Sequence, residues 1–249
     1  MSIHLKGVIT AGGLGTRLLP MTRVTNKHLL PVYDRPMIFY PIETLVQAGI
    51  EDIMIITGGN HAGDFLPLLG DGREFGLKRL HYTYQAREGG IAEALSLTRE
   101  FVGKDHVLVM LGDNIIEKNI KAYVRKFRQQ KQGARILLKE VEHPEQYGVP
   151  TFDDQGKIIQ ITEKPQTPST RYAVTGIYLY DNRVFEILQT LKPSGRGEME
   201  ITDVNNAYLQ MGELEYDILE GWWADCGETR SSLHEAGSLV ARTGANNVD

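Results

Sequence analysis

The chain of 249 residues has few of the features that mark several large classes of protein. It contains one cysteine, Cys226, so no intrachain disulfide can form, and we expect a reducing, cytoplasmic setting. Its longest apolar runs, such as Val107–Leu111, have the length of strands and fall short of the roughly 18–20 residues of a membrane span. No charged region followed by an apolar one indicates a signal peptide at the N-terminus. We therefore expect neither a secreted protein nor a membrane partner.

Basic clusters are also absent. Lys and Arg number 27 against 32 Asp and Glu, which gives a formal net charge of −5, and no basic run occurs. This excludes the usual electrostatic signature of a nucleic-acid partner. With 41% apolar and 24% charged residues, the composition fits one globular domain with a full core.

The first half of the chain alternates short β-branched runs with patterns of helical spacing. Strands are expected at Gly7–Thr10, Ile53–Thr57, Arg79–Tyr84 and Val107–Leu111, and helices at Met37–Ala48, Asp64–Leu69 and Ala92–Phe101. Pro36 suits a first helical position, and Gly49 suits the residue after a helix end. This order predicts an α/β fold with a mostly parallel sheet and helices on both faces.

The rhythm changes after residue 133. Strands are expected at Ala134–Glu140, Lys157–Glu163, Tyr172–Tyr180 and Glu213–Leu219, and helices at Val184–Leu191 and Glu198–Gln210. No linker, repeat or low-complexity segment separates the halves. We expect the second half to extend the same sheet and to add a substrate lobe.

A glycine-rich segment, Ala11–Arg17, follows the first expected strand. Glycines let backbone N–H groups approach phosphate oxygens, and Arg17 and Lys27 can neutralise their charge. The segment is not a P-loop, because no Gly-Lys-Ser/Thr follows it. A nicotinamide site is disfavoured, because Leu18 replaces the third glycine of the dinucleotide fingerprint and no acidic ribose ligand follows a second strand.

Other polar residues lie at the ends of expected parallel strands. Asp113 follows Val107–Leu111, and Gln85 follows the strand that ends at Tyr84. Ligands of open α/β sheets bind beyond the carboxyl ends of the strands. We therefore expect these side chains and the glycine-rich segment to form one site.

The string Gly-Gly-x-Gly-Thr-Arg-Leu-x-Pro, with Asn26-Lys27 and Leu30-Pro31 behind it, resembles the sugar-1-phosphate nucleotidylyltransferases. It is most similar to the glucose-1-phosphate thymidylyltransferases. The resemblance runs from about residue 5 to about residue 235 and continues through Pro31–Ile38, Leu111–Asn114, Glu163–Pro165, Ala173–Tyr178 and Arg196–Asp203.

The resemblance implies a Rossmann-like three-layer sandwich with a small sugar-binding lobe. It implies a single nucleotidyltransferase domain over residues 1–249, with a nucleotide-binding half to about residue 133 and a sugar-phosphate-binding half over about 134–235. The implied substrates are dTTP and glucose 1-phosphate, the cofactor is Mg²⁺, and the products are dTDP-glucose and pyrophosphate. The sugar phosphate, whose second pKa is about 6, attacks the α-phosphorus, so the enzyme must position the reactants and neutralise charge.

The resemblance also assigns residues. It implies that Arg17, Lys27 and Lys164 are catalytic and that Asp113 and Asp225 bind Mg²⁺. The residues implied to bind the nucleotide are Ala11, Gly12, Gly13, Gly15, Thr16, Gln85, Gly90 and Asp113. Those implied to bind the sugar phosphate are Tyr147, Gly148, Glu163, Val174, Tyr178 and Arg196.

The sequence departs from the family at two places. Cys226 and Glu228 replace both threonines of the family's Trp-x-Asp-Thr-Gly-Thr segment, and Thr10 stands where many relatives carry leucine. We interpret Cys226, Trp222 and Trp223 as packing residues, and His28 as a support for its neighbour Lys27.

Three alternatives stay open. The chain could be a uridylyl- or cytidylyltransferase, or a nucleotide-sugar-binding regulator without turnover. The cytidylyl alternative is weaker because that group's loop resembles Lys-Pro-Lys-Pro, and the regulator is disfavoured by retention of Arg17, Lys27, Asp113 and Asp225.

The C-terminal region differs from longer family members. The family-like sequence fades near 236–242, and Gly244–Asn247 is interpreted as a frayed end. We therefore expect a short form without the C-terminal helical extension, a homo-oligomer with altered interfaces, and weakened control by the end-product nucleotide sugar.

Overall fold

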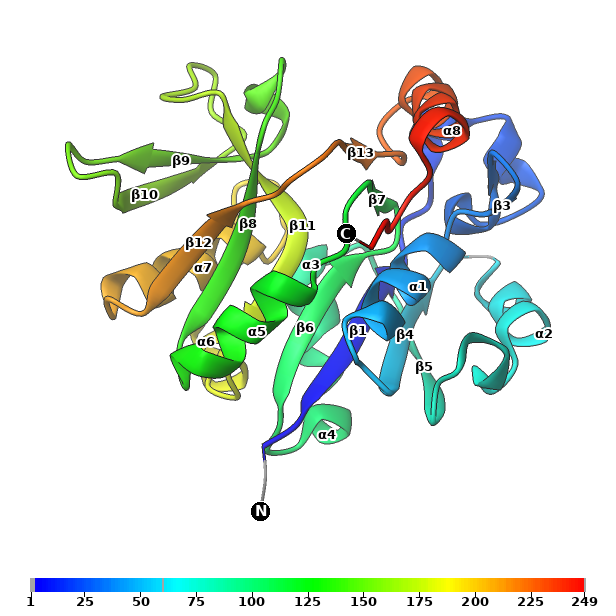
Figure 1. Ribbon diagram of the computed structural model, residues 1–249, viewed down its shortest axis with the longest axis horizontal. Helices are drawn as coiled ribbons and strands as arrows, with labels where there is room; N and C mark the ends of the chain where they lie inside the picture. Colours follow the sequence, from blue (N-terminus) through cyan, green and yellow to red (C-terminus); the bar gives the residue numbers. More distant parts are fainter. Residues whose placement is uncertain (1–2, 60, 249) are drawn as a thin grey trace.

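A seven-stranded sheet runs through the middle of the computed structural model, which describes residues 3–59 and 61–248 (Figure 1). The strand order is β12 (Leu214–Ile218), β8 (Ala134–Glu140), β11 (Tyr172–Tyr180), β6 (His106–Leu111), β1 (Leu5–Ala11), β4 (Asp52–Gly58) and β5 (Arg79–Gln85). β11 is antiparallel to both of its neighbours, and the other pairs are parallel. Strands of both halves therefore share one mostly parallel sheet, as predicted.

Helices cover both faces of the sheet and make three layers. They are α1 (Phe39–Gln47), α2 (Phe65–Leu69), α3 (Gly90–Ser96), α4 (Arg99–Val102), α5 (Lys121–Gln130), α6 (Val184–Thr190), α7 (Ile201–Gln210) and α8 (Arg230–Thr243). Two neighbouring residues of β1 show that the sheet is buried on both faces. Ile9 packs in the core under α1, α2 and α5, and Val8 packs in the core under α3, α4, α6 and α7. Side chains of a strand alternate between faces, so both faces need apolar residues.

Three small antiparallel pairs stand beside the main sheet. They are β2 (Pro31–Val32) with β3 (Arg35–Pro36), β7 (Asn114–Ile116) with β13 (Trp223–Asp225), and β9 (Gly148–Phe152) with β10 (Ile158–Glu163). Short 3-10 turns are η1 (Thr16–Leu18), η2 (Met21–Arg23), η3 (Lys27–Leu29), η4 (Ala62–Asp64), η5 (Arg73–Phe75) and η6 (Pro144–Gln146). The β9–β10 hairpin projects away from the sheet on the side of β8 and β12 (Figure 1). Within residues 3–59 and 61–248, no helix is both long and apolar enough to cross a membrane.

The predicted strands are confirmed within about two residues at each end, and α1, α2, α6 and α7 match predicted helices. The predicted role of Pro36 is wrong. Pro36 pairs with Pro31 in a short hairpin, and α1 begins at Phe39. The N–H groups of Met37 and Ile38 donate to the carbonyls of Leu30 and His28, so this stretch is tied to the preceding loop.

One helix was predicted over Ala92–Phe101, and the structure divides it into α3 and α4. Between them, the backbone N–H of Thr98 donates to the carbonyl of Leu95 at 3.0 Å, and the hydroxyl of Thr98 donates to the same carbonyl at 2.7 Å. Side-chain hydrogen bonds of this kind compete with the helical ladder. Thr98 is fully buried, which fixes the break.

The interpretation of Gly244–Asn247 as a frayed end is wrong. Asn246 is 3% exposed, accepts from the Thr44 hydroxyl at 2.6 Å and donates to the carbonyl of Tyr40 at 3.1 Å. Its own N–H donates to Ile116 O, and the N–H of Asn247 donates to Glu117 O. The segment after α8 is therefore docked against α1 and β7.

Candidate active site

A cavity of about 440 Å³ opens at the carboxyl ends of β1 and β6 and is lined by both halves of the chain. It contains nearly all predicted site residues: Gly12, Gly13, Gly15, Thr16, Arg17, Lys27, Gln85, Gly90, Asp113, Tyr147, Gly148, Glu163, Lys164, Val174, Tyr178, Arg196 and Asp225. Ala11 is the exception, since it is a fully buried residue of β1 and does not line the cavity.

The glycine-rich segment turns sharply after β1. Gly15 has a φ of +64°, and a Cβ there would lie 2.8 Å from the Thr22 side chain, so any other residue would be strained. The Thr22 hydroxyl donates to the carbonyl of Gly15 at 2.8 Å and holds the turn. The N–H of Leu14 donates to the carboxylate of Glu88 at 3.1 Å. At least one amide of this segment thus already has an anionic partner.

A second loop places Lys27. Asn26 caps η3: its side-chain oxygen accepts from the backbone N–H of His28 at 3.0 Å, and its amide donates to Ala11 O at 3.3 Å. The Lys27 ammonium reaches Asp113 at 2.6 Å. Burial, with the nearby charge of Lys27, lowers the pKa of His28 to about 3, so this imidazole is neutral at pH 7. His28 contacts Asn26 at 2.7 Å and supports the Lys27 loop, as predicted.

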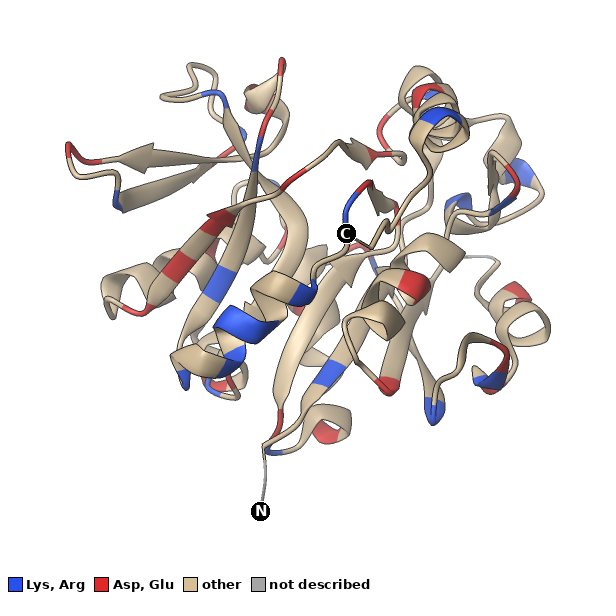
Figure 2. Cartoon of the chain, in the orientation of Figure 1, with Lys and Arg blue, Asp and Glu red and all other residues tan. Residues whose placement is uncertain are grey.

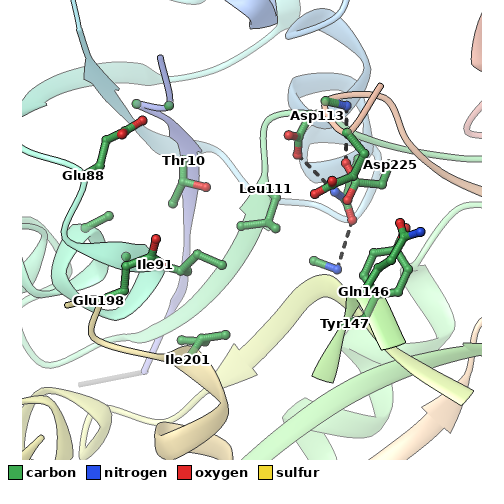
Figure 3. Close-up of a pocket in the computed structure, with 18 of the residues that line it drawn as sticks. Thr10, Glu88, Ile91, Leu111, Asp113, Gln146, Tyr147, Glu198, Ile201 and Asp225 are labelled. Atoms are coloured by element: carbon green, nitrogen blue, oxygen red, sulfur yellow. Dashed lines mark hydrogen bonds between the residues drawn. The ribbon is translucent and has the colours of Figure 1, made fainter. Parts of the chain in front are cut away.

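Two carboxylates lie side by side at the ends of two short paired strands. Asp113 directly precedes β7, and Asp225 is the last residue of β13. Asp225 stands opposite Asn114 in the β7–β13 pair, so it lies beside Asp113 (Figure 3). Although burial by itself would raise the pKa of Asp113, the Lys27 ammonium lowers it below its usual value. Burial and the charge of Asp113 raise the pKa of Asp225. The negative charge of the pair therefore lies mainly on Asp113 beside Lys27, and Asp225 resists ionisation.

This donor set fits a small divalent cation. Mg²⁺ prefers oxygen ligands and takes one or two carboxylates, with phosphate oxygens and water in the remaining positions. Within the described residues, no group of three or more His, Cys, Asp or Glu side chains forms a ready-made metal cage. An open pair such as Asp113 and Asp225 is what a substrate-sharing magnesium site requires.

Asn114 and Gly227 shape this end of the cavity. Asn114 donates to Asp113 at 3.2 Å, and its oxygen accepts from Gly176 N and from the indole N–H of Trp223. A Cβ on Gly227 would lie 2.2 Å from Asp113 Oδ2 and 2.5 Å from Lys27 Nζ. Only glycine fits at position 227 without moving the charged groups.

Charged groups also gather in the second half of the cavity. Glu163 accepts from the Thr202 hydroxyl at 2.5 Å and from Arg196 at 3.3 Å. Arg196 also contacts Glu200 at 2.8 Å and Glu198 at 3.7 Å, so it is held by more than a helix-start ion pair. Lys164 follows β10 with a φ of +43°, and its N–H donates to Tyr147 O at 2.9 Å.

Gln85 and Gly90 face each other at the opposite end of the cavity. The Gln85 amide donates to Gly90 O at 3.2 Å. Gly90 has a φ of +88°, and a Cβ there would lie 2.5 Å from Met199 O. Glu88 and Ile91 lie on this side, far from Asp113 and Asp225 (Figure 3).

Several lining residues were missed from the sequence, among them Glu88, Gln146, Thr202, Gly227 and Glu228. Gly227 and Glu228 lie two and three residues after Asp225, so the motif around Asp225 could have indicated them. Glu228 forms an ion pair with Arg17. Trp223, predicted to pack, also lines the cavity and meets Tyr147 edge to face, with ring centroids 5.1 Å apart. Trp222 and the fully buried Cys226 do belong to a packed cluster.

Comparisons with known proteins identify relatives of this chain. The model of the nucleotidyl transferase family matches residues 6–242. A glucose-1-phosphate thymidylyltransferase of Neisseria meningitidis is 46% identical over 239 residues, covering 95% of this chain and 82% of the relative. Another from Xanthomonas campestris pv. campestris is 45% identical, covering 94% of this chain and 80% of the relative.

Solved structures give the same picture. A Bacillus anthracis protein assigned as a glucose-1-phosphate thymidylyltransferase, in complex with sucrose, is 51% identical with a TM-score of 0.91, covering 99% of this chain and 98% of that one. A UDP-glucose pyrophosphorylase complexed with UDP-glucose is 25% identical with a TM-score of 0.83, covering 97% of this chain and 99% of that one. Because the family model matches residues 6–242 and a relative is 46% identical over 95% of the chain, the chain belongs to the nucleotidyl transferase family.

Proposed function

We propose that the protein transfers a thymidylyl group from dTTP to glucose 1-phosphate, giving dTDP-glucose and pyrophosphate. One observation carries the proposal: a glycine-rich turn with Arg17, the Lys27–Asp113–Asp225 cluster, and Glu163 with Lys164 line the same cavity. Relatives at 44–46% identity that carry the name glucose-1-phosphate thymidylyltransferase support the choice of substrates.

In the proposed reaction, a phosphate oxygen of glucose 1-phosphate bonds to the α-phosphorus of dTTP, and the bond from that phosphorus to the pyrophosphate oxygen breaks. Both reactants are anions, so positioning and charge neutralisation supply most of the catalysis. Arg17 and the amides of the glycine-rich turn bind the triphosphate, and Lys27 contacts the reacting phosphates. Lys164 and Arg196 bind the sugar phosphate, and Glu163 accepts hydrogen bonds from sugar hydroxyls.

Asp113 and Asp225 hold Mg²⁺ in this proposal. When bound, Mg²⁺ offsets the charge that develops on the phosphate oxygens. The protein's own part is to aim both carboxyl groups at the cavity, and because burial and Asp113 raise the pKa of Asp225, a bound cation would favour its ionised form. Asn114 fixes Asp113 by donating at 3.2 Å, and the N–H of Gly227 donates to Asp225 at 3.3 Å.

Gln85 and Gly90 read the base. An amide side chain has one acceptor and two donors, so Gln85 can match the imide edge of thymine, with the Gly90 backbone beside it. The Gln85 amide donates to Gly90 O at 3.2 Å, which fixes its position beside the Gly90 backbone. The division into a nucleotide half (about 1–133) and a sugar-phosphate half (about 134–235) goes with this assignment. The homo-oligomer and the cytoplasmic setting remain predictions.

Uridylyl transfer is the second candidate. The fold likeness to a UDP-glucose pyrophosphorylase favours it, and thymine and uracil share the same imide edge. A pyrophosphate-release assay with glucose 1-phosphate and each of dTTP, UTP, CTP, ATP and GTP tests both. We expect the highest kcat/KM with dTTP. A higher value with UTP would replace the first candidate by the second, and no release with any nucleotide would favour a regulator without turnover.

A further inference from the structure

Arg17, the residue assigned above to the triphosphate, already has an anionic partner inside the chain. It forms an ion pair with Glu228, 211 positions away in sequence. Both side chains line the cavity, and Arg17 remains 57% exposed against 28% for Glu228. The contact joins η1, after β1, to the segment between β13 and α8.

A second carboxylate contacts the glycine-rich turn itself. Glu88 accepts from the N–H of Leu14 at 3.1 Å. Backbone amides of a glycine-rich turn and an arginine fork are the groups that bind phosphate oxygens in general. Two carboxylates from distant elements therefore contact groups that a triphosphate would use.

Glu228 has a further neighbour that Glu88 lacks. It lies three residues after Asp225, and Gly227 between them packs directly on Asp113 and Lys27. The cavity wall thus carries a third negative charge beside the two carboxylates assigned to the metal. An incoming triphosphate meets this charge at the same place where it must take Arg17.

We propose that Glu228 is a positioning residue that holds Arg17 until a triphosphate replaces it as the partner of Arg17. In this exchange the guanidinium leaves the carboxylate and pairs with phosphate oxygens, and no covalent bond forms or breaks. Glu228 therefore sets the affinity for the triphosphate, and this inference rests on the proposed role of Arg17.

The size of the effect follows from exposure. An ion pair that is open to water contributes little, so we expect removal of the Glu228 charge to tighten triphosphate binding by only about three- to fivefold. The sign is the informative part. If Glu228 instead held Arg17 in the orientation that binds the ligand, its removal would weaken binding.

The test is calorimetric titration with inorganic tripolyphosphate, which has no base, and separately with dTTP, each with EDTA and with Mg²⁺. The variants are Glu228→Gln, Glu228→Asp, Arg17→Ala and the double variant Arg17→Ala/Glu228→Gln. Glu235→Gln is the matched control, since it removes one carboxylate from exposed α8 outside the cavity.

We expect Glu228→Gln to tighten tripolyphosphate binding about three- to fivefold with EDTA, and Glu228→Asp and Glu235→Gln to stay within about twofold of the wild type. In the Arg17→Ala background, Glu228→Gln should change the affinity by less than about twofold. In turnover, Glu228→Gln should lower the KM for dTTP more than it changes kcat. Unchanged or weaker binding by Glu228→Gln, or an equal gain without Arg17, would overturn the proposal.

The two ligands separate this inference from the proposed function. If dTTP binds no tighter than tripolyphosphate while the Glu228 variants behave as expected, the base assignment fails and the role of Glu228 stands. If dTTP binds tightly and turns over but Glu228→Gln has the opposite sign, the function stands and the role of Glu228 is wrong.

Discussion

Two buried acidic clusters lie at opposite ends of the central strands of the sheet, and their surroundings differ. Asp113 and Asp225 lie beyond the carboxyl end of β6. Asp181 follows β11, which runs antiparallel to β6, with Tyr180 paired to Val107 near the start of that strand. Asp181 is 3% exposed, and it sits in a cluster with Arg183, Tyr208 and Glu213.

Hydrogen bonding separates the clusters. Asp181 accepts from Gly133 N at 2.7 Å, the Tyr208 hydroxyl at 2.8 Å, and the backbone N, Nε and Nη2 of Arg183 at 2.6–3.0 Å. Although burial alone would raise it, these donors lower the pKa of Asp181. Within the described residues, the side-chain carboxylate of Asp225 accepts only from Gly227 N, at 3.3 Å, and the pKa of Asp225 is raised. A buried carboxylate that is fully paired stabilises the fold, and one left under-paired is available to a ligand.

The charge map agrees with this contrast. Helix α5 carries basic residues, and the neighbouring strand β12 carries acidic residues, on the outer part of the molecule (Figure 2). There Asp217 contacts both Lys126 and Arg135. Negative charge is paired within the fold in this region, whereas in the cavity Asp225 resists ionisation.

The strongest way to break the comparison is to neutralise the under-paired cluster. Asp113→Asn and Asp225→Asn should each lower kcat by at least about 100-fold, because each removes charge that holds the cation against the phosphates. The readout is pyrophosphate release in Mg²⁺, with circular dichroism to verify folding. Glu235→Gln serves as control, and near-normal turnover by either aspartate variant would sink the two-aspartate assignment.

Neutralising the paired cluster should act on stability instead. Asp181→Asn leaves buried donors of Gly133 and Arg183 poorly matched, so we expect unfolding free energy to fall by about 2–3 kcal/mol. Denaturant titration measures this, and kcat at 25 °C should stay within about twofold of wild type. A loss of turnover without a loss of stability would show that the cluster reaches the active site.

The same variant carries a pH signature. Because the folded pKa of Asp181 lies below its unfolded value of about 3.9, its contribution is fully present above about pH 4 and is lost as pH falls through the folded pKa. The difference in unfolding free energy between wild type and Asp181→Asn should therefore shrink below about pH 4. A difference that stays constant down to pH 2.5 would contradict the ionised role of Asp181.

Base recognition should show a smaller, selective effect. Gln85→Ala removes a side chain that would be hydrogen-bonded to the base, at about 1–3 kcal/mol. The KM for dTTP should rise well above any change in the KM for glucose 1-phosphate, as steady-state kinetics with each substrate varied will show. Equal changes in both would mean that Gln85 does not read the base.

The smallest effect sharpens the comparison by its sign. Without metal, Asp225→Asn removes like-charge repulsion next to Asp113, so the variant should be more stable than wild type at pH 8 in EDTA. For a chain of this size, about 1 kcal/mol corresponds to about 2–4 °C in Tm. Because the pKa of Asp225 is raised to about 8 in the fold, against about 3.9 in the unfolded chain, this gain should be largest above about pH 8 and should shrink progressively as the pH falls toward about 4. A Tm below wild type at pH 8 would place Asp225 with the structural carboxylates.

The sequence was enough for the main sheet, because β-branched runs such as Ile53–Ile56 report burial directly. It did not reveal β9, α5 or α8. Helix α5 carries five basic or amide side chains in its last six residues, Arg125, Lys126, Arg128, Gln129 and Gln130, so its buried face is narrow. In the site, motifs predicted Asp113 and Lys27. The Arg17–Glu228 contact joins residues 211 positions apart, and only the folded chain brings such partners together.

The two tryptophans of the chain, Trp222 and Trp223, are neighbours beside Asp225. Trp223 donates its indole N–H to Asn114, which in turn donates to Asp113. Both sources of indole fluorescence in the protein therefore lie two and three residues before Asp225. Arrival of a cation or a triphosphate should register as a change in emission from the unlabelled chain, so the protein carries its own optical reporter of occupancy.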